Sequence, residues 1–499
     1  MKTNRIQKIL LSIMMLAVCC TVDAQLGKSL LRQAKNSAET KVRIETSRAV
    51  NKGLDKGTAA VKEAATSKHK SPTSNSVENA KTIYVNHSTG SNRNDGSKAS
   101  PLKNIQKAID VASDGTIIYV AEGNYFGTLN SGNIFITKPV EIYGGYSSDF
   151  STRDILKYRT LVQPDPKSNG TQKGQGTVRL QVRKPGSRVV IDGIIFDRGN
   201  AISYNTRGEG KPEGLQSAMM QPIGAKGLGG PNLEMRDVLT AETAEIYLEN
   251  PQCDFEIRNC AFLNAPNYGI RGSFRGKAKI INNIFINNRM AACEIPGADA
   301  KINSEIEFAY NTVLFMWSRL RDLATMGYGY RYMTGVNSYV HHNILGCSIY
   351  SALDRARVDS SKAREKERIT TSEHNIFFLN KQADLIIPGG GVYLMINVPD
   401  FEDVEQLAKV EGNKELKDPS VLKGKINEAY LNGFLSATYK EKTSSDPNSP
   451  ANTFRSAMGM NMVGTMSSSV SMYANRYPWE EALLLFGAMN GYGAQIPSN

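Results

Sequence analysis

Residues 255–295 read FEIRNCAFLNAPNYGIRGSFRGKAKIINNIFINNRMAACEI and contain one pattern twice. Each copy has an apolar residue, a spacer, two polar or small residues, a second spacer and a large apolar residue. The first copy is Ile257, Asn259, Cys260 and Phe262, and the second, 23 residues later, is Ile280, Asn282, Asn283 and Phe285. Self-similarity at a period of 20 to 50 residues is typical of a solenoid or a propeller.

The pattern returns three more times towards the C-terminus, the last time without its leading apolar residue. These copies are Phe308, Tyr310, Asn311, Val313; Val340, His342, Asn343, Leu345; and Ser372, His374, Asn375, Phe377. A period of 23 is too short for the four-stranded blade of a propeller. The sequence therefore predicts a parallel β-helix, in which each strand lies about 4.8 Å from its copy in the next rung.

Stacking of the copies assigns a place to each position of the pattern. The apolar positions point inward, so Phe262 is expected over Phe285. Asparagine suits the bends because it tolerates left-handed backbone angles and forms local hydrogen bonds. Stacked asparagines such as Asn283 and Asn311 are expected to pass amide hydrogen bonds along the coil.

The first 24 residues predict a secretory signal peptide. They combine a basic start, an apolar core from Ile9 to Cys20 and a small residue, Ala24, before the expected cleavage site. A lipoprotein signal at Cys19 is the alternative, but the usual small residue does not precede that cysteine. The sequence therefore predicts export to the periplasm, the outer-membrane surface or the medium of a Gram-negative-type bacterium.

Residues 25–80 are expected to form a basic helical stalk followed by a linker. The segment 25–70 holds eleven Lys/Arg against four Asp/Glu, with apolar residues at roughly helical spacing. This composition fits either a solvated stalk or peripheral contact with an anionic membrane surface. Of the net charge of +12, only about +3 is left for residues 71–499. Without a recognisable nucleic-acid-binding motif, that near-neutral body argues against nucleic acid as a partner.

The folded body is expected to begin with a strand at residues 82–86, a helix at 100–112 capped by Ser100, and a strand at 116–121. ITKPVEIYGGYSSDFSTRD (136–154) and VIDGIIF (190–196) read as further rungs. Over residues 82–395 the chain resembles the pectin-lyase-like superfamily of exported proteins. That resemblance implies an all-β fold, a right-handed single-stranded parallel β-helix with an N-terminal helical cap and extra helices at both termini, here assigned to residues 81–397. It implies no particular reaction.

Residues 398–499 are expected to form a helical and irregular C-terminal cap. Phe401, Val404 and Leu407 have helical spacing, and Pro478–Phe486 predicts a short apolar helix. Because an exposed β-helix end is prone to pair with other chains, this segment is expected to cover the open end or a flank of the coil.

Three charged residues are the catalytic candidates. Counting along the repeat aligns Arg271, Glu294 and Asp354 in one outward column on an exposed strand face, with the carboxylates about two rungs apart. Two carboxylates at that distance fit an inverting glycoside hydrolase, whereas an arginine suits a polysaccharide lyase acting on uronic acids. The alternative is a solvated Arg–Glu ladder with a purely structural role.

A loop at residues 315–335 is the candidate substrate-binding wall. It is rich in aromatic and basic residues, which suit stacking on sugars and binding of anions. The candidates are Trp317, Arg319, Arg321, Tyr328, Tyr330 and Arg331. Packing of a long aromatic loop onto the coil explains the same composition equally well.

Neither a cofactor nor a metal is expected. His341 and His342 are adjacent on a predicted strand, so they should face opposite sides, and no calcium-loop or Cys-x-x-Cys pattern occurs. The four cysteines after the signal segment are expected to be free, buried thiols: Cys253, Cys260, Cys293 and Cys347.

These observations predict an exported β-helix that binds or processes polysaccharide along an exposed strand face. The alternative is a non-catalytic envelope or surface module that acts through interactions. Whether the protein is an enzyme stays open at the level of sequence.

Overall fold

A computed structural model describes most of the chain beyond residue 81. The described ranges are 82–128, 132–165, 178–197, 204–206, 233–235, 244–265, 267–297, 304–317, 327–333, 335–355, 370–389, 392–405, 407–439, 446–460 and 477–497. The chain divides into two units, residues 1–75 and 76–499, and all described residues belong to the second. The predicted signal peptide (1–24) and stalk (25–80) lie outside them. Within these ranges no helix has both the length and the apolarity needed to cross a membrane.

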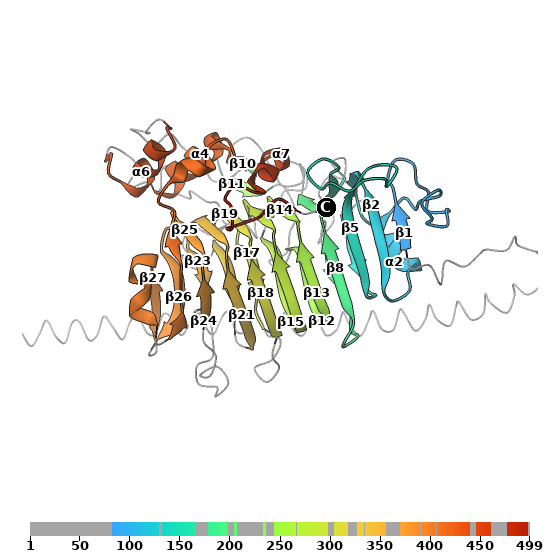
Figure 1. Cartoon of the computed structure of the whole chain (residues 1–499), viewed down its shortest axis with the longest axis horizontal. Helices are drawn as coiled ribbons and strands as arrows, with labels where there is room; N and C mark the ends of the chain where they lie inside the picture. The colour runs from blue at the N-terminus through green and yellow to red at the C-terminus, as the bar shows by residue number, and fades with distance from the viewer. Residues whose placement is uncertain are drawn as a thin grey trace, which may run out of the picture. The chain divides into compact units, whose positions relative to one another are not determined.

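The described part of the second unit is a coil of parallel strands on three faces, visited in the order face 1, face 2, face 3 (Figure 1). Face 1 contains β1 (Thr82–Val85), β2 (Thr116–Ala121), β5 (Val140–Tyr146), β8 (Arg188–Asp192), β13 (Asp254–Arg258), the second half of β15 (Tyr268–Ile281), β18 (Ser304–Ala309), β21 (Val336–His341), β24 (Thr370–Glu373) and β28 (Ala408–Lys409).

Face 2 is a nine-stranded sheet of short strands: β3 (Gly123–Tyr125), β6 (Thr160–Val162), β9 (Ile195–Asp197), β14 (Ala261–Leu263), β16 (Ile284–Ile286), β19 (Thr312–Met316), β22 (Ile344–Ser348), β25 (Ile376–Phe378) and β29 (Lys414–Glu415). Face 3 contains β4 (Ile134–Ile136), β7 (Val178–Leu180), β12 (Ala244–Gln252), the first half of β15, β17 (Ala291–Ile295), β20 (Tyr328–Tyr332), β23 (Ser351–Asp354), β26 (Ala383–Gly389) and the antiparallel β27 (Val392–Ile396). A separate hairpin joins β10 (Tyr204–Thr206) to β11 (Leu233–Met235).

The five copies of the sequence pattern stack in the predicted register. On face 2, Phe262 pairs with Phe285, and that column continues through Val313, Leu345 and Phe377. The rings of Phe262 and Phe285 are parallel, with centroids 4.7 Å apart. The predicted solenoid of parallel strands is therefore confirmed.

The bends between faces 1 and 2 also follow the pattern. The first bend residue has a positive φ in every copy, whether it is Asn259, Tyr310 or His342. The next residue carries the amide ladder from Asn283 onward: the Asn283 side chain donates to Asn311 Oδ1 at 3.1 Å, and Asn311 donates in turn to the next rung. These buried amides satisfy one another and the backbone carbonyls inside the coil.

Helical segments close both ends of the apolar interior. At the N-terminal end, α2 (Ile105–Val111) buries Ile105, Ala108 and Ile109 against the core. This helix is shorter than predicted because the backbone of Leu102 is extended and hydrogen-bonds to β1, so Ser100 does not cap it. At the C-terminal end, Phe401 in η3 (Val398–Val404) packs on Phe377 with ring centroids 5.7 Å apart.

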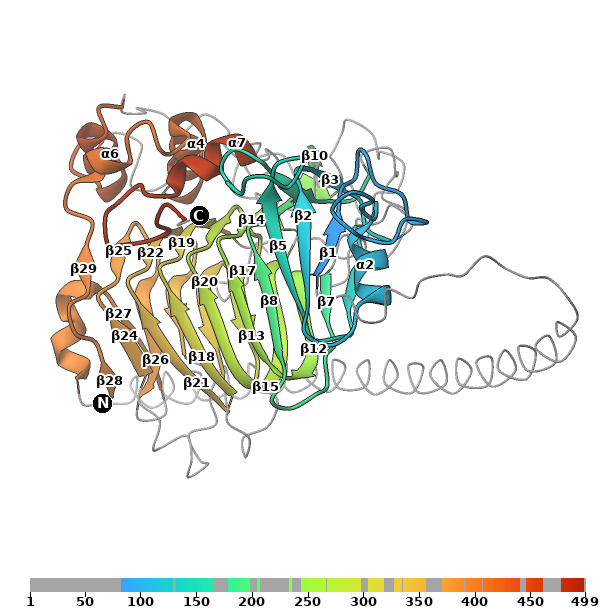
Figure 2. The same ribbon diagram turned by 45° about the vertical axis from the view of Figure 1, so that its right-hand side comes forward.

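The C-terminal region covers the flank formed by face 2. It comprises η4 (Pro419–Leu422), α4 (Glu428–Thr438), α6 (Pro450–Ala457), α7 (Trp479–Ala482) and η6 (Leu483–Leu485). Figures 1 and 2 both show α4, α6 and α7 beside β14, β19 and β25. Leu263, Ile286 and Leu314 of face 2 share one apolar cluster with Leu431, Phe434 and Leu485 of these segments. Strands β14, β16 and β25 of face 2 are thus buried on both sides, which explains why they are apolar at every position.

Candidate functional site

The catalytic candidates occupy one column on face 3. Arg271 pairs in register with Glu294, Glu294 with Arg331, and Arg331 with Asp354. The two carboxylates are therefore two rungs apart, as the repeat predicts. Arg331, which the sequence assigned to the substrate-binding loop, fills the rung between them. We call these four residues the face 3 column.

Ion pairs join every neighbour in the face 3 column. Arg271 Nε lies 2.9 Å from Glu294 Oε1, and the terminal nitrogens of Arg331 lie 3.6 Å from Glu294 and 3.1 Å from Asp354. The side chains of Glu294, Arg331 and Asp354 are 5%, 4% and 0% exposed. Burial acts to lower the pKa of Arg331, but the adjacent carboxylates outweigh it and raise that pKa. The column is therefore a buried charge network rather than the exposed strand face that the sequence predicted.

The aromatic residues beside the column are also packed. The Arg331 guanidinium lies over the Tyr328 ring, 4.2 Å from its centroid, and hydrogen-bonds to its hydroxyl. Tyr330 faces the interior of the coil, where its ring stacks on Phe308 at 4.4 Å and its hydroxyl contacts Ser338 at 2.9 Å. The expectation that Tyr330 lines a substrate wall is wrong, because strand alternation turns it inward beside the outward Arg331.

Trp317 is buried on the other flank. Its indole nitrogen donates to Asn287 Oδ1 at 2.7 Å, and the guanidinium of Arg289 lies 4.5 Å from the indole centroid. This contact agrees with the alternative given above, in which the aromatic loop packs onto the coil. Arg319 and Arg321 lie outside the described residues, and a substrate-binding role for the 315–335 loop stays a prediction.

The geometry of the column bears on acid–base chemistry. An inverting hydrolase needs one protonated carboxyl and one carboxylate that activates a water. Here the guanidinium of Arg331 contacts both Glu294 and Asp354, so each carboxylate is already engaged by a buried cation. The arrangement suits a fixed electrostatic brace between rungs better than a pair of proton-transfer groups.

A second candidate site lies on face 1, where a shallow trough of about 420 Å³ crosses β15, β18, β21 and β24. We call it the face 1 trough. Its polar lining consists of Lys277, Lys279, Glu305, Glu307, Asn337, Ser338, Tyr339 and Thr371. Tyr339 is 42% exposed, and its hydroxyl donates to Glu373 Oε2 at 2.9 Å. This outward surface combines an exposed aromatic ring with a depression.

The charges in the trough balance. Lys277 lies 3.5 Å from Glu305, and Lys279 lies 3.6 Å from Glu307. These contacts are long and the lysine side chains are 74% and 58% exposed, so each pair is worth less than about 1 kcal/mol. Water or a ligand hydroxyl can replace them at little cost. The sequence contains a signal for this surface: polar residues at alternate positions of successive strands. They are Lys277, Lys279, Glu305, Glu307 and Tyr339.

A histidine pair lies on the same face, at the bend. His342 has a φ of 54°, so the chain turns and the Nδ1 atoms of His341 and His342 come within 3.0 Å. The expectation that these rings face opposite sides is wrong because the strand ends at His341. The part of the chain that the structure describes contains no group of three or more His, Cys, Asp or Glu side chains arranged to hold a metal.

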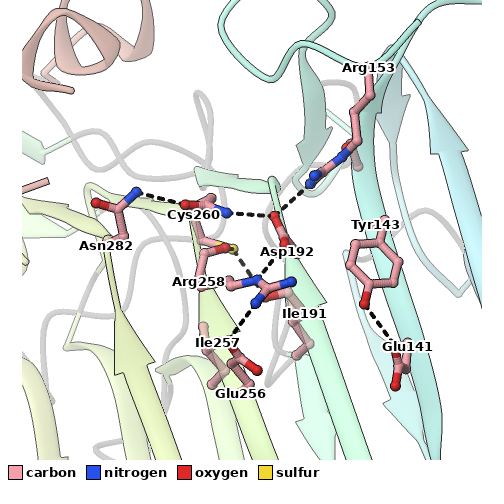
Figure 3. A network of polar contacts seen from close by, with 12 residues as sticks. Glu141, Tyr143, Arg153, Ile191, Asp192, Glu256, Ile257, Arg258, Cys260 and Asn282 are labelled. Carbon is pink, nitrogen blue, oxygen red and sulfur yellow. Dashed lines mark hydrogen bonds and ion pairs between the residues drawn. The ribbon is translucent and has the colours of Figure 1, made fainter. Parts of the chain in front are cut away.

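Near the start of the coil, one buried carboxylate gathers three donors (Figure 3). Asp192 accepts from Arg153 at 2.6 Å, from Arg258 Nε at 2.5 Å and from Asn259 at 2.9 Å. Arg258 also pairs with Glu256 at 2.7 Å. The network ties the loop after β5 to β8 and β13, so its evident role is to lock successive rungs together.

Comparison with known proteins adds one match. Residues 88–194 match a protein family of unknown function, DUF1565, which is associated with β-helix proteins. The matched range begins just after β1 and ends just after β8. It covers the early rungs and about a fifth of the chain, and it includes neither the face 3 column nor the face 1 trough. Among curated proteins, none matches this chain.

Proposed function

We propose that this chain is an exported β-helix protein that binds a polysaccharide along the face 1 trough without cleaving it. The observation that carries the proposal is the exposed ring of Tyr339 within a depression that crosses four parallel strands. The proposal combines the polysaccharide ligand expected from the sequence with a non-catalytic module. Export and a distant relation to the pectin-lyase-like superfamily are also part of the proposal.

The regular spacing of the coil suits a polymeric ligand. Equivalent outward side chains repeat about every 4.8 Å across the strands, so the trough offers a periodic row of hydrogen-bonding groups. Tyr339 adds a ring with an apolar face and a polar tip. A shallow, periodic and open surface of this kind fits an extended chain better than a compact small molecule.

Charge balance favours a neutral polysaccharide. The two lysines and two glutamates of the trough cancel, and Glu373 beside Tyr339 pairs with Lys409. A polyanion would face Glu305 and Glu307 together with the lysines, so it gains little net attraction. Hydroxyl groups, in contrast, can accept from the lysines and donate to the carboxylates.

The state of the face 3 column supports binding rather than cleavage. Its carboxylates are buried and each contacts an arginine. The trough itself offers exposed, paired Lys and Glu side chains.

The test is to titrate the chain from Gln25 onward with a panel of neutral and acidic polysaccharides. We expect neutral polymers to bind, and Tyr339→Ala to weaken that binding about tenfold. Tyr393→Ala is the matched control, because Tyr393 is 59% exposed on β27 of face 3 and should leave affinity unchanged. New reducing ends or unsaturated products would instead establish an enzyme. Equal effects of both variants, or binding of acidic polymers alone, would overturn the proposed site.

A further inference from the structure

A second depression lies at the C-terminal end of the coil, away from the face 1 trough. It has a volume of about 590 Å³, within the range of small-molecule sites. Segments from the last rungs, from the start of η3, from β29, from the end of α4 and from α6 line it. We call it the end pocket.

Aromatic side chains form fixed walls in the end pocket. The rings of Phe378 and Phe454 are nearly parallel, with centroids 5.4 Å apart. Tyr439 is 5% exposed, and its hydroxyl donates to the carbonyl of Leu379. These residues come from the coil and from two C-terminal helical segments, so the pocket exists because the C-terminal region packs on face 2.

Asp384 is the buried charged group of the pocket lining. It is 6% exposed and accepts hydrogen bonds from Asn380 Nδ2 at 2.9 Å and from the Val398 backbone at 3.1 Å. Among the described residues, no lysine, arginine or histidine forms an ion pair with it. Lys381 and Lys417 line the pocket from exposed positions. A buried carboxylate is ordinarily paired, because burial without an opposite charge is costly.

We propose that the end pocket binds a small organic cation, with its ammonium group at Asp384 and its apolar body against Phe378 and Phe454. The carboxylate supplies the missing charge complement, and aromatic faces attract cations in addition to packing against hydrocarbon. The remaining ionisable groups of the lining are Lys381, Asp400, Glu415, Lys417 and Tyr439. The two lysines and the two further carboxylates offset each other, so the net charge offered to a ligand is that of Asp384. This site is independent of the polysaccharide proposed for face 1.

The probe is phenethylammonium, titrated calorimetrically into the chain from Gln25 onward at pH 8. Its neutral and anionic counterparts of similar size are 2-phenylethanol and phenylacetate. We expect binding of the cation with a dissociation constant of about 1 mM or below, which suits so small a ligand, and at least about tenfold weaker binding of both counterparts. No binding of the cation at about 10 mM, or equal binding of the alcohol, would overturn the proposal.

Variants locate the site. Asp384→Asn keeps the shape of the side chain and should weaken binding of the cation at least about tenfold, whereas Asp400→Asn, at an exposed position of the same lining, should change it less than about twofold. Equal effects of the two variants would contradict the assignment.

A measurement on the unmodified protein covers the case in which Asp384→Asn fails to fold. Burial raises the pKa of Asp384 to about 6, so at pH 5 most of this carboxyl is protonated. We therefore expect binding of phenethylammonium to weaken several-fold between pH 8 and pH 5. Affinity that does not change over this range would overturn the proposal.

Discussion

Arg331 Nη2 lies 3.1 Å from Asp354 Oδ2, with both side chains buried. Arg331→Ala leaves two buried carboxylates without this guanidinium, and removing one partner of a buried network typically costs about 3–5 kcal/mol. We expect a loss of that size in urea unfolding. Arg188→Ala is the control, because Arg188 bridges Glu141 and Glu256 with a side chain that is 50% exposed, and should cost less than about 1 kcal/mol. Equal costs would show that the column does not brace the coil.

The asparagine ladder gives a second prediction. Asn343 Oδ1 accepts from the backbone of Asn311 at 2.8 Å, and Asn343 Nδ2 donates to Asn375 at 2.8 Å. Asn343→Ala leaves several buried polar groups without a hydrogen-bond partner. We therefore expect a loss of about 3 kcal/mol in the free energy of unfolding. Asn337→Ala, at an exposed position of the preceding strand, should change it by less than about 0.5 kcal/mol. A small effect at Asn343 would mean that water replaces the amide.

The asparagine ladder could be predicted from the sequence, whereas the orientation of Tyr330 could not. The repeated pattern predicted the stacking of Asn283 and its successors although their intervals are 28, 32 and 32 residues, because the pattern constrains the register of every bend to which it applies. The longer segment before Tyr330 removed that constraint. If β20 is placed one residue earlier or later, its inward and outward side chains are exchanged. The sequence therefore could not decide whether Tyr330 or Arg331 takes the outward position.

Burial of the face 3 column was unpredictable for another reason. Alternation along β17 gives the direction of Glu294 but not what packs over it, since burial depends on contacts between residues far apart in the chain. The burial of the outer side of face 2 was easier to predict from the sequence. Its strands are apolar at successive positions, as in Ile284–Ile286, and such runs indicate burial on both sides.

Two glycines near the C-terminus provide a matched pair. Gly491 and Gly493 both have positive φ, at 77° and 66°. A Cβ on Gly493 would lie 2.5 Å from Thr312 Oγ1 and 2.6 Å from Ile344 Cδ1, whereas one on Gly491 meets no atom within 4 Å. Both alanine variants bear the conformational cost, so we expect Gly493→Ala to destabilise by about 1–3 kcal/mol more than Gly491→Ala. Equal melting temperatures would show that residues around Gly493 do not hold the tail against the bends.

The four cysteines of the described region are free and buried, as expected from the sequence. Burial raises the pKa of the Cys253 and Cys260 thiols to about 12, and a thiol in that state reacts slowly because the thiolate is the nucleophile. We expect a thiol reagent at pH 8 to modify none of the four in the folded chain from Gln25 onward. In denaturant it should modify all four. Fewer than four in denaturant would reveal a disulfide.

The histidines at the bend predict how stability depends on pH. Burial, the largest cause, lowers the pKa of both His341 and His342, and for His342 the neighbouring histidines lower it further. The unfolded chain therefore binds these protons more readily than the folded one below the ordinary histidine value of about 6.5. By linkage, the free energy of unfolding falls as the pH drops through that value and is fully retained above it.

His342→Asn tests this account with little structural disturbance. Asn259 and Asn282 occupy the same bend position with φ of 53° and 57°, so asparagine accepts the left-handed backbone there. We expect the variant to match the unmodified chain in urea unfolding at pH 8 and to lose less stability between pH 7 and pH 5.5. An unchanged loss over that interval would assign the acid sensitivity to other groups, such as His341, whose pKa burial also lowers. A variant less stable at pH 8 would instead show that the His342 ring, stacked 5.0 Å from Tyr310, stabilises the bend by packing.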